Sequence, residues 1–258
     1  MTLTTPEIAS WIGAFMWPFM RVGALMISAP VFSNIMMPVR IRVFLGVALT
    51  VAVLPAVGSV PQVDPLSLQA LLIGVQQILA GLAMGLLMAI ALQTVVVAGE
   101  SISLSMGLGF ATMVDPQTGV AVPVLSQFLL IMATLLFLAM GGHLMLIQLL
   151  AESFTLIPID STGISPQDLY TVAAWGAEMY AGAVLIALPA VAVLLTVNMI
   201  IGVMTRAAPQ LNIFSVGFPI TMTVGFVTVL MVVLPSLPER MSAVWRLAFE
   251  TIRRILGA

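Results

Sequence analysis

The sequence contains no cysteine and no lysine, and it has one histidine among its 258 residues. The absence of cysteine excludes disulfide bonds, thiolate metal sites and cysteine nucleophiles, and one histidine excludes a metal site built from several imidazoles. Charged residues make up only 7% of the chain, whereas a soluble globular protein has about 25%. The net charge of −2 is small and scattered, so it does not indicate binding to nucleic acid. These deficits exclude a soluble globular protein.

Long uncharged runs take the place of the missing charges. Residues 65–99, 116–151, 179–205 and 207–238 contain no Asp, Glu, Lys or Arg, and these runs are 35, 36, 27 and 32 residues long. About 20 apolar residues in a helix cross a bilayer. The sequence therefore predicts an all-α, polytopic membrane protein of long, kinked helical hairpins. We expect one membrane-embedded domain over residues 1–238 and an amphipathic C-terminal helix over 239–258.

Apolar runs and the positions of Pro, Gly and charge place the expected helices. We expect six hydrophobic helices, at about residues 8–31, 43–57, 66–98, 120–150, 169–204 and 213–234. The fifth should bend near Pro189, and Pro235 and Pro238 should end the sixth. Gly81 and Gly85 form a small-residue face on the third helix, which suits close contact with another helix.

The C-terminal segment has the pattern of an amphipathic helix. Apolar residues recur at helical spacing and form one stripe: Met241, Val244, Trp245, Ala248, Phe249, Ile252, Ile255 and Leu256. Arg246, Glu250 and Arg254 stand four residues apart on the opposite face. Two interpretations remain open, namely a helix that lies in the membrane interface and a helix that docks on a partner subunit.

The positions of the arginines predict the orientation, because short basic loops stay in the cytoplasm. Arg40, Arg42, Arg206 and the arginine-rich tail should therefore be inside, and the acidic loop at 151–168 outside. Six complete crossings cannot satisfy all of these positions at once. We therefore expect that at least one hydrophobic segment does not cross the membrane fully.

A few charges lie in or beside the apolar segments. Arg21 lies within the first segment, and Glu100, Asp115 and Arg206 lie near the ends of others. An unpaired charge at bilayer depth costs at least about 2.5–3.5 kcal/mol, so Arg21 should have a carboxylate, a water-filled space or another subunit as its partner. A proton or ion relay is one interpretation, but the longest apolar runs hold no carboxylate. Structural pairing, snorkelling to the membrane surface or an assembly role is the favoured interpretation.

Residue types and spacings for catalysis are missing. His143 follows two glycines and is expected at a helix end or in a hydrogen bond with a backbone carbonyl. There is no Ser/His/Asp set, no phosphate-binding glycine loop and no spacing of metal ligands. We therefore expect a protein that is not an enzyme and that carries no metal or other cofactor.

Residues 99–119 differ from the apolar runs on either side, because nine of these 21 residues are Gly, Ser or Thr. Non-helical backbone at membrane depth persists only where protein or a water-filled cavity covers it. Methionine is flexible and fills irregular gaps. The segment can therefore seal a pore and move aside, or it can be a plain connecting loop. Its candidate pore-plug residues are Met106, Gly107, Leu108, Gly109, Phe110, Ala111 and Met113.

Several short motifs, in the same order and at the same spacing, resemble the FliR family of flagellar type III export-gate subunits. They lie along the whole chain: Gly99-Glu100, Met106-Gly107, Phe110-Ala111, Asp115-Pro116, Arg21 with Ser28 to Phe32, Pro38 to Arg42, Pro209 to Phe214, and Gly217 to Pro219. The related SctT (YscT-like) subunits of virulence secretion systems are similar but usually diverge in residues 99–119. The resemblance covers essentially all 258 residues.

The resemblance implies a place in a protein export channel. FliR-like chains join FliP-like and FliQ-like subunits, with an FlhB-like subunit alongside, in the bacterial inner membrane at the flagellar basal body. The earlier part of the chain corresponds to FliP and the later hairpin to FliQ. Residues 99–119 match the family's plug loop, and exported flagellar proteins and membrane lipid are the other expected partners. A small-solute secondary transporter and a pore-free assembly scaffold remain the alternatives.

Overall fold

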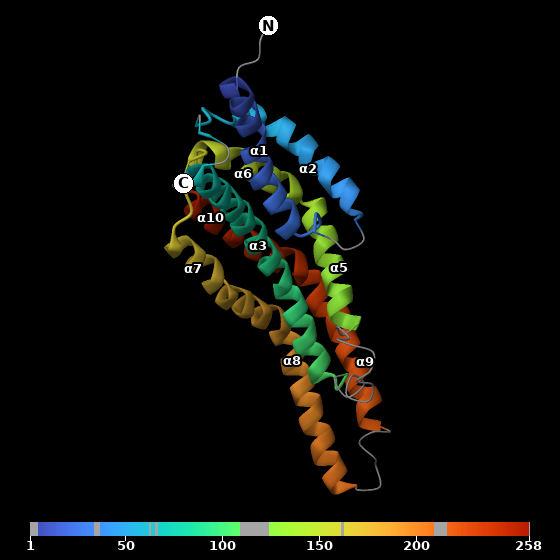
Figure 1. Cartoon of the computed structure of the whole chain (residues 1–258). Coiled ribbons are helices and arrows are strands. Elements are labelled where there is room, and N and C mark those ends of the chain that lie inside the picture. The colour runs from blue at the N-terminus through green and yellow to red at the C-terminus, as the bar shows by residue number, and fades with distance from the viewer. Residues whose placement is uncertain are drawn as a thin grey trace, which may run out of the picture. The chain divides into compact units, whose positions relative to one another are not determined.

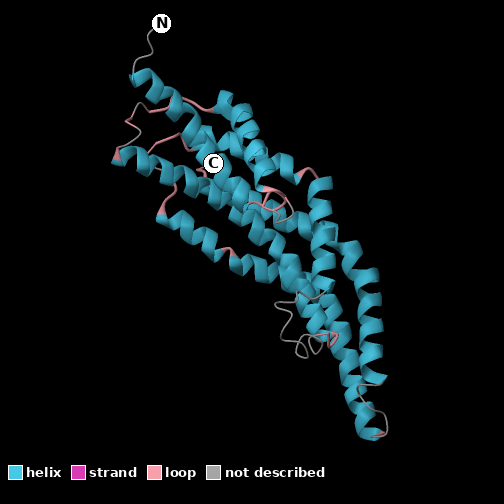
Figure 2. Cartoon of the chain, turned by 45° about the vertical axis from the view of Figure 1, so that its right-hand side comes forward, coloured by secondary structure: helices cyan, strands magenta, loops and turns pink. Residues whose placement is uncertain are grey.

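A computed structural model describes residues 5–33, 37–61, 63–64, 67–108, 124–160, 163–208 and 216–257. The described residues form helices joined by short connections, and no strand occurs among them (Figures 1 and 2). The elements in chain order are α1 (Thr5–Ser28), α2 (Val39–Val53), η1 (Leu54–Ala56), α3 (Leu68–Ser105), α5 (Val124–Ala139), α6 (Gly142–Leu156), α7 (Pro166–Ala174), α8 (Gly176–Ala207), α9 (Phe218–Thr228), the π-helical turn η4 (Val229–Val233) and α10 (Leu234–Ile255). The all-α prediction is confirmed.

Four helical stretches of the described residues are long and apolar enough to cross a membrane. They are Val39–Ala56, Leu68–Ser105, Pro166–Ala207 and Phe218–Ile255, and α5 with α6 makes a fifth if this bent pair counts as one span. The chain is therefore a multi-pass membrane protein. Six hydrophobic helices were expected, with at least one that does not cross fully. The structure breaks the fourth expected helix into α5 and α6.

The chain forms two compact units, and the first comprises residues 1–91, 137–176 and 245–258. In this unit α1 packs on α3 through the two glycines that the sequence singled out. A Cβ atom on Gly81 would meet the Arg21 carbonyl oxygen and lie 2.8 Å from the Cβ of Ala24. A Cβ on Gly85 would meet the hydroxyl of Ser28. The predicted close contact through these glycines is confirmed, and its partner is α1.

The apolar stripe of α10 is buried by the chain itself. Within the first unit Trp245, Ala248, Phe249, Ile252, Ile255 and Leu256 are all buried. Trp245 packs edge to face on Phe137, with their ring centroids 5.3 Å apart. The prediction that this stripe lies in a membrane interface or against a partner is therefore wrong, because an intramolecular core already covers it.

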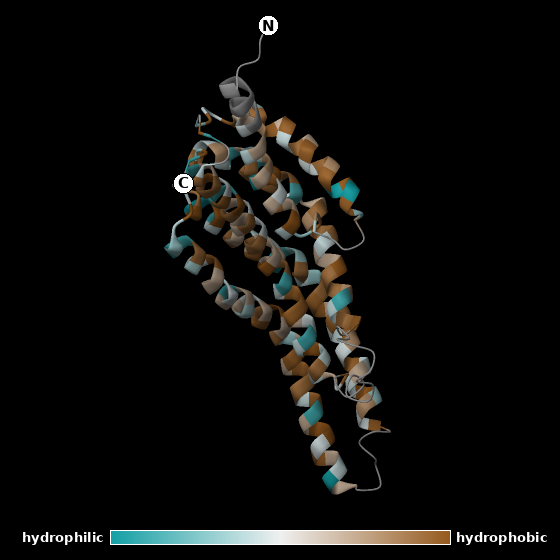
Figure 3. Ribbon diagram, viewed as in Figure 1, coloured by the Kyte–Doolittle hydropathy of each residue, from teal (hydrophilic) through white to brown (hydrophobic). Residues whose placement is uncertain are grey.

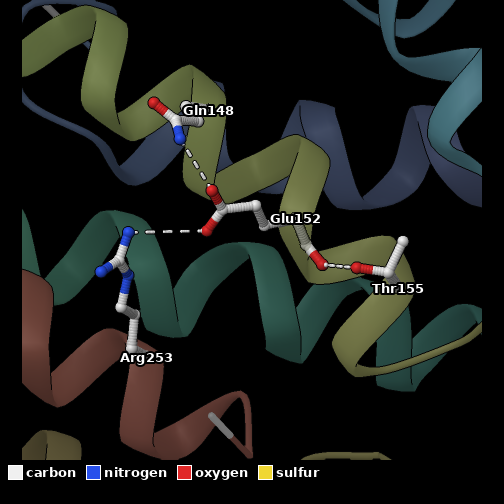
Figure 4. A network of polar contacts seen from close by, with 4 residues as sticks. All are labelled: Gln148, Glu152, Thr155 and Arg253. Carbon is white, nitrogen blue, oxygen red and sulfur yellow. Dashed lines mark hydrogen bonds and ion pairs between the residues drawn. The ribbon is translucent and has the colours of Figure 1, made fainter.

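The hydrophilic side of the same helix carries an ion pair at the surface (Figure 4). Arg253 of α10 lies 3.7 Å from one carboxylate oxygen of Glu152 on α6. Gln148, one turn earlier on α6, donates to the other oxygen of Glu152 at 2.8 Å. The side chains of Arg253 and Glu152 are 55% and 36% exposed, so solvent screens their attraction and the pair contributes little stability.

The second unit comprises residues 92–136 and 177–244. It holds the C-terminal part of α3, most of α5, nearly all of α8, then α9, η4 and the start of α10. In this unit α3 approaches α5 closely, because a Cβ on Gly99 would lie 2.7 Å from the Cα of Ser126. Gly99 is therefore a packing residue within a helix, whereas its sequence context predicted a non-helical segment.

Three expected helix boundaries are wrong. Helix α3 continues through residues 99–105, because the backbone there keeps its helical hydrogen bonds while Gly99 packs on α5. Arg40 and Arg42 lie in α2, because that helix begins at Val39 rather than near residue 43. Pro235 and Pro238 do not end the sixth helix, which continues to Ile255.

The wider π-helical turn at Val229–Val233 comes immediately before these two prolines. A proline ring in an α-helix clashes with the carbonyl group four residues earlier and removes one hydrogen bond. A π turn changes the local pairing of carbonyl groups, so the prolines continue the helix rather than stop it. The stripe at residues 241–256 is thus the end of a 38-residue helical stretch and not a separate tail.

Helix α5 ends just before two glycines, and the second of them lies against an aromatic ring. Gly141 has a positive φ of 73°, which a residue with a Cβ rarely adopts. A Cβ on Gly142 would overlap the ring of Phe137. The expected continuous helix over residues 120–150 therefore breaks here, and His143 lies half-buried in the first turn of α6.

Helix α8 keeps much of its apolar surface exposed. Leu195, Met199, Ile200, Val203 and Met204 are between 46% and 73% exposed, and Figure 3 shows the predominantly hydrophobic colour along this helix. Pro189 lies inside α8, which runs unbroken from Gly176 to Ala207. Only 28% of the most apolar window of the α7–α8 stretch is buried. Such a surface needs lipid or another protein subunit as its surroundings.

Candidate functional site

The candidate plug residues begin at the C-terminal end of α3, and this end has a complete cap. Gly107 has a φ of 80°, donates its N–H to the Leu104 carbonyl at 3.0 Å, and is followed by Leu108, which donates to the Ser103 carbonyl at 3.0 Å. These two bonds around a left-handed glycine define a Schellman motif. Gly107 thus terminates the helix in one defined conformation.

Two other helices satisfy the remaining carbonyl groups at this end of α3. The side-chain amide of Asn198 on α8 donates to the Ser105 carbonyl at 3.1 Å. The hydroxyl of Thr221 on α9 donates to the Phe218 carbonyl of its own helix at 2.9 Å and shares this proton with the Met106 carbonyl, which lies 3.4 Å away. The final carbonyl groups of a helix have no partner within the helix. Here α8 and α9 supply those partners, so three helices meet at the cap.

The Met106 side chain packs the cap of α3 against Gly225 of α9. Met106 is fully buried, and a Cβ on Gly225 would lie 2.6 Å from its Cγ and 2.8 Å from its Sδ. The missing side chain at Gly225 therefore leaves the space that Met106 fills. Met106 is an anchor for the end of α3, held by packing on one side and by its carbonyl hydrogen bond on the other.

The structure places the other predicted site residues as follows. Leu108 is half-buried at the end of the cap, and Glu100 is half-buried within α3. Arg206 is exposed in the last turn of α8, where a positive charge interacts favourably with the helix dipole. The remaining predicted site residues lie outside the described residues: Gly109, Phe110, Ala111, Met113 and Asp115.

Arg21 in the first compact unit is fully buried, and all five of its N–H donors have an acceptor. Nε donates to Oε1 of Gln77 at 2.9 Å, and one Nη donates to the same oxygen and to the Ile157 carbonyl. The other Nη donates to the Ser153 carbonyl at 2.7 Å and to its hydroxyl at 3.0 Å. A guanidinium group has five such donors, so its hydrogen-bonding capacity is saturated.

The expectation of a carboxylate or another external partner for Arg21 is wrong, because neutral groups of the same chain surround it. Ser153 and Ile157 lie at the C-terminal end of α6, where the helix dipole places partial negative charge. The Arg21 guanidinium also lies 4.3 Å from the centroid of the Phe154 ring, which attracts cations through its π face. These contacts connect α1, α3 and α6.

The uncharged polar residues that bind Arg21 and cap α3 were not predicted from the sequence. Gln77, Ser153, Asn198 and Thr221 all lie in helices whose other residues are mostly apolar. A polar side chain in an apolar helix needs a hydrogen-bond partner, and this signal was present in the sequence. In the part of the chain that the structure describes, no three His, Cys, Asp or Glu side chains group closely enough to hold a metal ion.

Fold and site together define an all-α, multi-pass membrane protein with a glycine-capped helix end held by two neighbouring helices. The family described as bacterial export proteins, family 1, matches residues 12–248. The chain belongs to this family.

The chain is also similar in sequence to FliR proteins of several bacteria. The chain is 39% identical to the flagellar biosynthetic protein FliR of Pectobacterium carotovorum over 256 residues, which cover 99% of this chain and 97% of that protein. It is 39% identical to FliR of Escherichia coli K12 over 87% of this chain and 86% of that one. With Bacillus subtilis FliR it shares 30% identity, and the match covers 95% of each protein.

Proposed function

We propose that this chain is a subunit of the flagellar protein export apparatus in the bacterial inner membrane at the basal body. In this role it forms a channel with FliP-like and FliQ-like subunits, next to an FlhB-like subunit, and flagellar proteins pass through that channel. It acts as a structural and gating component rather than as an enzyme. The observation that carries the proposal is the match to FliR proteins along nearly the whole chain.

The exposed apolar helices support an assembly role. Phe44 on α2 is 75% exposed, Met199 on α8 is 73% exposed, and Met231 in η4 is 73% exposed. Only 17% of the most apolar window of Val39–Ala56 is buried. The charged residues are too few to cover such surfaces, so lipid and the neighbouring FliP-like and FliQ-like subunits are their natural partners. Arg21, Glu100, Asp115 and Arg206 have structural or assembly roles in this proposal.

The same proposal assigns the channel plug to the residues that follow the α3 cap. Met106, Gly107 and Leu108 form the fixed base of this plug, because packing and hydrogen bonds hold them. Gly109, Phe110, Ala111 and Met113 form the part that closes the channel, since they combine small residues with soft apolar side chains. The cap fixes the position from which residues 109–113 begin. A plug with a fixed base can return to the same closed position.

A deletion that spares the cap tests the plug. Removing residues 109–113 while keeping Met106 to Leu108 should leave the complex assembled and make the membrane permeable to ions. The measurement is the conductance of liposomes that contain the purified complex, with complex yield on a native gel as the assembly control. A matched variant replaces residues 109–113 with five Gly and Ser residues, so that the length of the connection is kept.

The two variants distinguish a plug from a plain connection. If apolar side chains close the channel, the length-matched variant should leak as much as the deletion does. If both variants assemble normally and conduct no more than the unmodified complex, the plug assignment is wrong. Membership of the export apparatus is tested separately, by co-purification of FliP-like and FliQ-like subunits with the unmodified chain.

A further inference from the structure

Pro189 removes one hydrogen-bond donor from the middle of α8. In an α-helix each backbone N–H donates to the carbonyl group four residues earlier, and proline has no N–H. The carbonyl group that loses its helical donor is therefore that of Leu185. The structure supplies a replacement from another helix, because Nη1 of Arg240 on α10 donates to the Leu185 carbonyl oxygen at 2.7 Å.

The chemistry of this contact suits a replacement donor. A guanidinium forms charge-assisted hydrogen bonds, which are stronger than bonds between neutral groups. Arg240 is half-buried and lies on the second turn of α10, in the same compact unit as Leu185 and Pro189. Leu185 and Arg240 are 55 residues apart in the chain, and their contact joins α8 to α10 at the point where α8 lacks its own hydrogen bond.

We propose that Arg240 and Pro189 act as a single positioning device that fixes the course of α8 beyond residue 189. Pro189 cannot donate to the Leu185 carbonyl. Arg240 donates to that carbonyl instead and thereby holds α8 against α10. Arg240 is thus required because residue 189 is a proline. A chain with an N–H donor at residue 189 would need Arg240 much less.

The device has a consequence for the cap of α3. The segment of α8 beyond Pro189 carries Asn198, whose amide holds the Ser105 carbonyl at the end of α3. If Arg240 no longer donates to the Leu185 carbonyl, the part of α8 beyond Pro189 is held less firmly in its direction relative to α10. Arg240 therefore positions Asn198 at the cap without touching it. Leu185, Pro189, Asn198 and Arg240 all belong to the second compact unit, and their contacts do not require a channel.

Hydrogen exchange of backbone amides in residues 183–200 tests the proposal in the full-length chain purified in detergent. Arg240→Gln should raise the exchange rates in this segment by about fivefold to tenfold, the range expected when a charge-assisted hydrogen bond is lost at a half-exposed site. Arg246→Gln is the matched control, because Arg246 is an exposed arginine on the same helix. It should leave exchange in residues 183–200 unchanged.

The decisive comparison repeats Arg240→Gln in a Pro189→Ala background. The alanine restores the N–H donor to the Leu185 carbonyl, so the loss of Arg240 should now raise exchange by less than twofold. Arg240→Lys, which keeps a charged donor, should have an intermediate effect in the original background. Equal increases from Arg240→Gln in both backgrounds would overturn the proposal. If Arg240→Gln alone cannot be purified, its recovery in the Pro189→Ala background supports the proposal, and failure in both backgrounds contradicts it.

Discussion

Gln77 on α3 accepts two hydrogen bonds from Arg21 on α1, both at the same side-chain oxygen. Both residues are buried, at 1% and 0% exposure. The pair holds α1 against α3 a short distance from Gly81, whose missing side chain lets the two helices approach closely. A buried cation is thereby held by an amide and by the end of α6 rather than by a carboxylate.

Substitution of Arg21 should destabilise the fold rather than block a chemical step. Arg21→Met removes all five donors. It leaves the acceptors on Gln77 and Ser153 buried without a donor, and the half-buried Ile157 carbonyl also loses its donor. Each unsatisfied buried group costs about 1–3 kcal/mol, so we expect a free-energy loss of about 3 kcal/mol or more. The measurement is thermal unfolding of the purified chain, together with its yield from membranes.

A second substitution checks the reason for that loss. Arg21→Met combined with Gln77→Leu should recover part of the stability, because the amide oxygen no longer needs a donor. Normal yield and normal thermal unfolding of Arg21→Met, with protein export lost, would instead assign a functional charge to Arg21.

The cap at Gly107 predicts a backbone effect. Gly107→Ala should destabilise the end of α3, because a left-handed conformation costs an L-residue about 1–2 kcal/mol. Asn tolerates this conformation better than Ala, so Gly107→Asn should be the milder of the two variants. Hydrogen exchange at residues 100–108 measures the effect locally. An equal result for the two variants would show that φ does not determine the preference for glycine here.

The glycines at the α1–α3 contact predict opposite outcomes for two similar substitutions. Gly81→Ala should separate the helices and destabilise the chain, because the added Cβ overlaps the Arg21 carbonyl oxygen. Gly23→Ala on α1 is the matched control, since a Cβ there meets nothing within 4 Å. It should be neutral or stabilise the helix by about 1 kcal/mol. Thermal unfolding of both variants checks the prediction, and a Gly23→Ala loss as large as that of Gly81→Ala would contradict it.

Helix type and the Gly81–Gly85 contact were predictable from the sequence, because both depend on local composition and spacing. The helix ends at residues 99–105 and 235–238 were not. Glycine and proline usually interrupt helices. At Gly99, however, the helix continues and the missing side chain lets α5 pack closely. Before Pro235, a π turn changes which backbone N–H and carbonyl groups form hydrogen bonds. Local preference gave the wrong answer where a tertiary contact or an altered turn offset it.

The candidate site divides in the same way. The sequence by itself determined that the chain is a helical membrane protein, that it carries one charge within an apolar segment at Arg21, and that soft apolar and small residues follow Met106. Only the tertiary structure decided that Arg21 binds neutral acceptors on α3 and α6, and that Asn198 and Thr221 complete the cap at Gly107. Hydrophobic composition is a property of each segment, whereas a hydrogen-bond partner far along the chain depends on how the helices pack. The same sequence is compatible with many hydrogen-bonded pairs of polar residues, and the packing of the helices determines which pairs form.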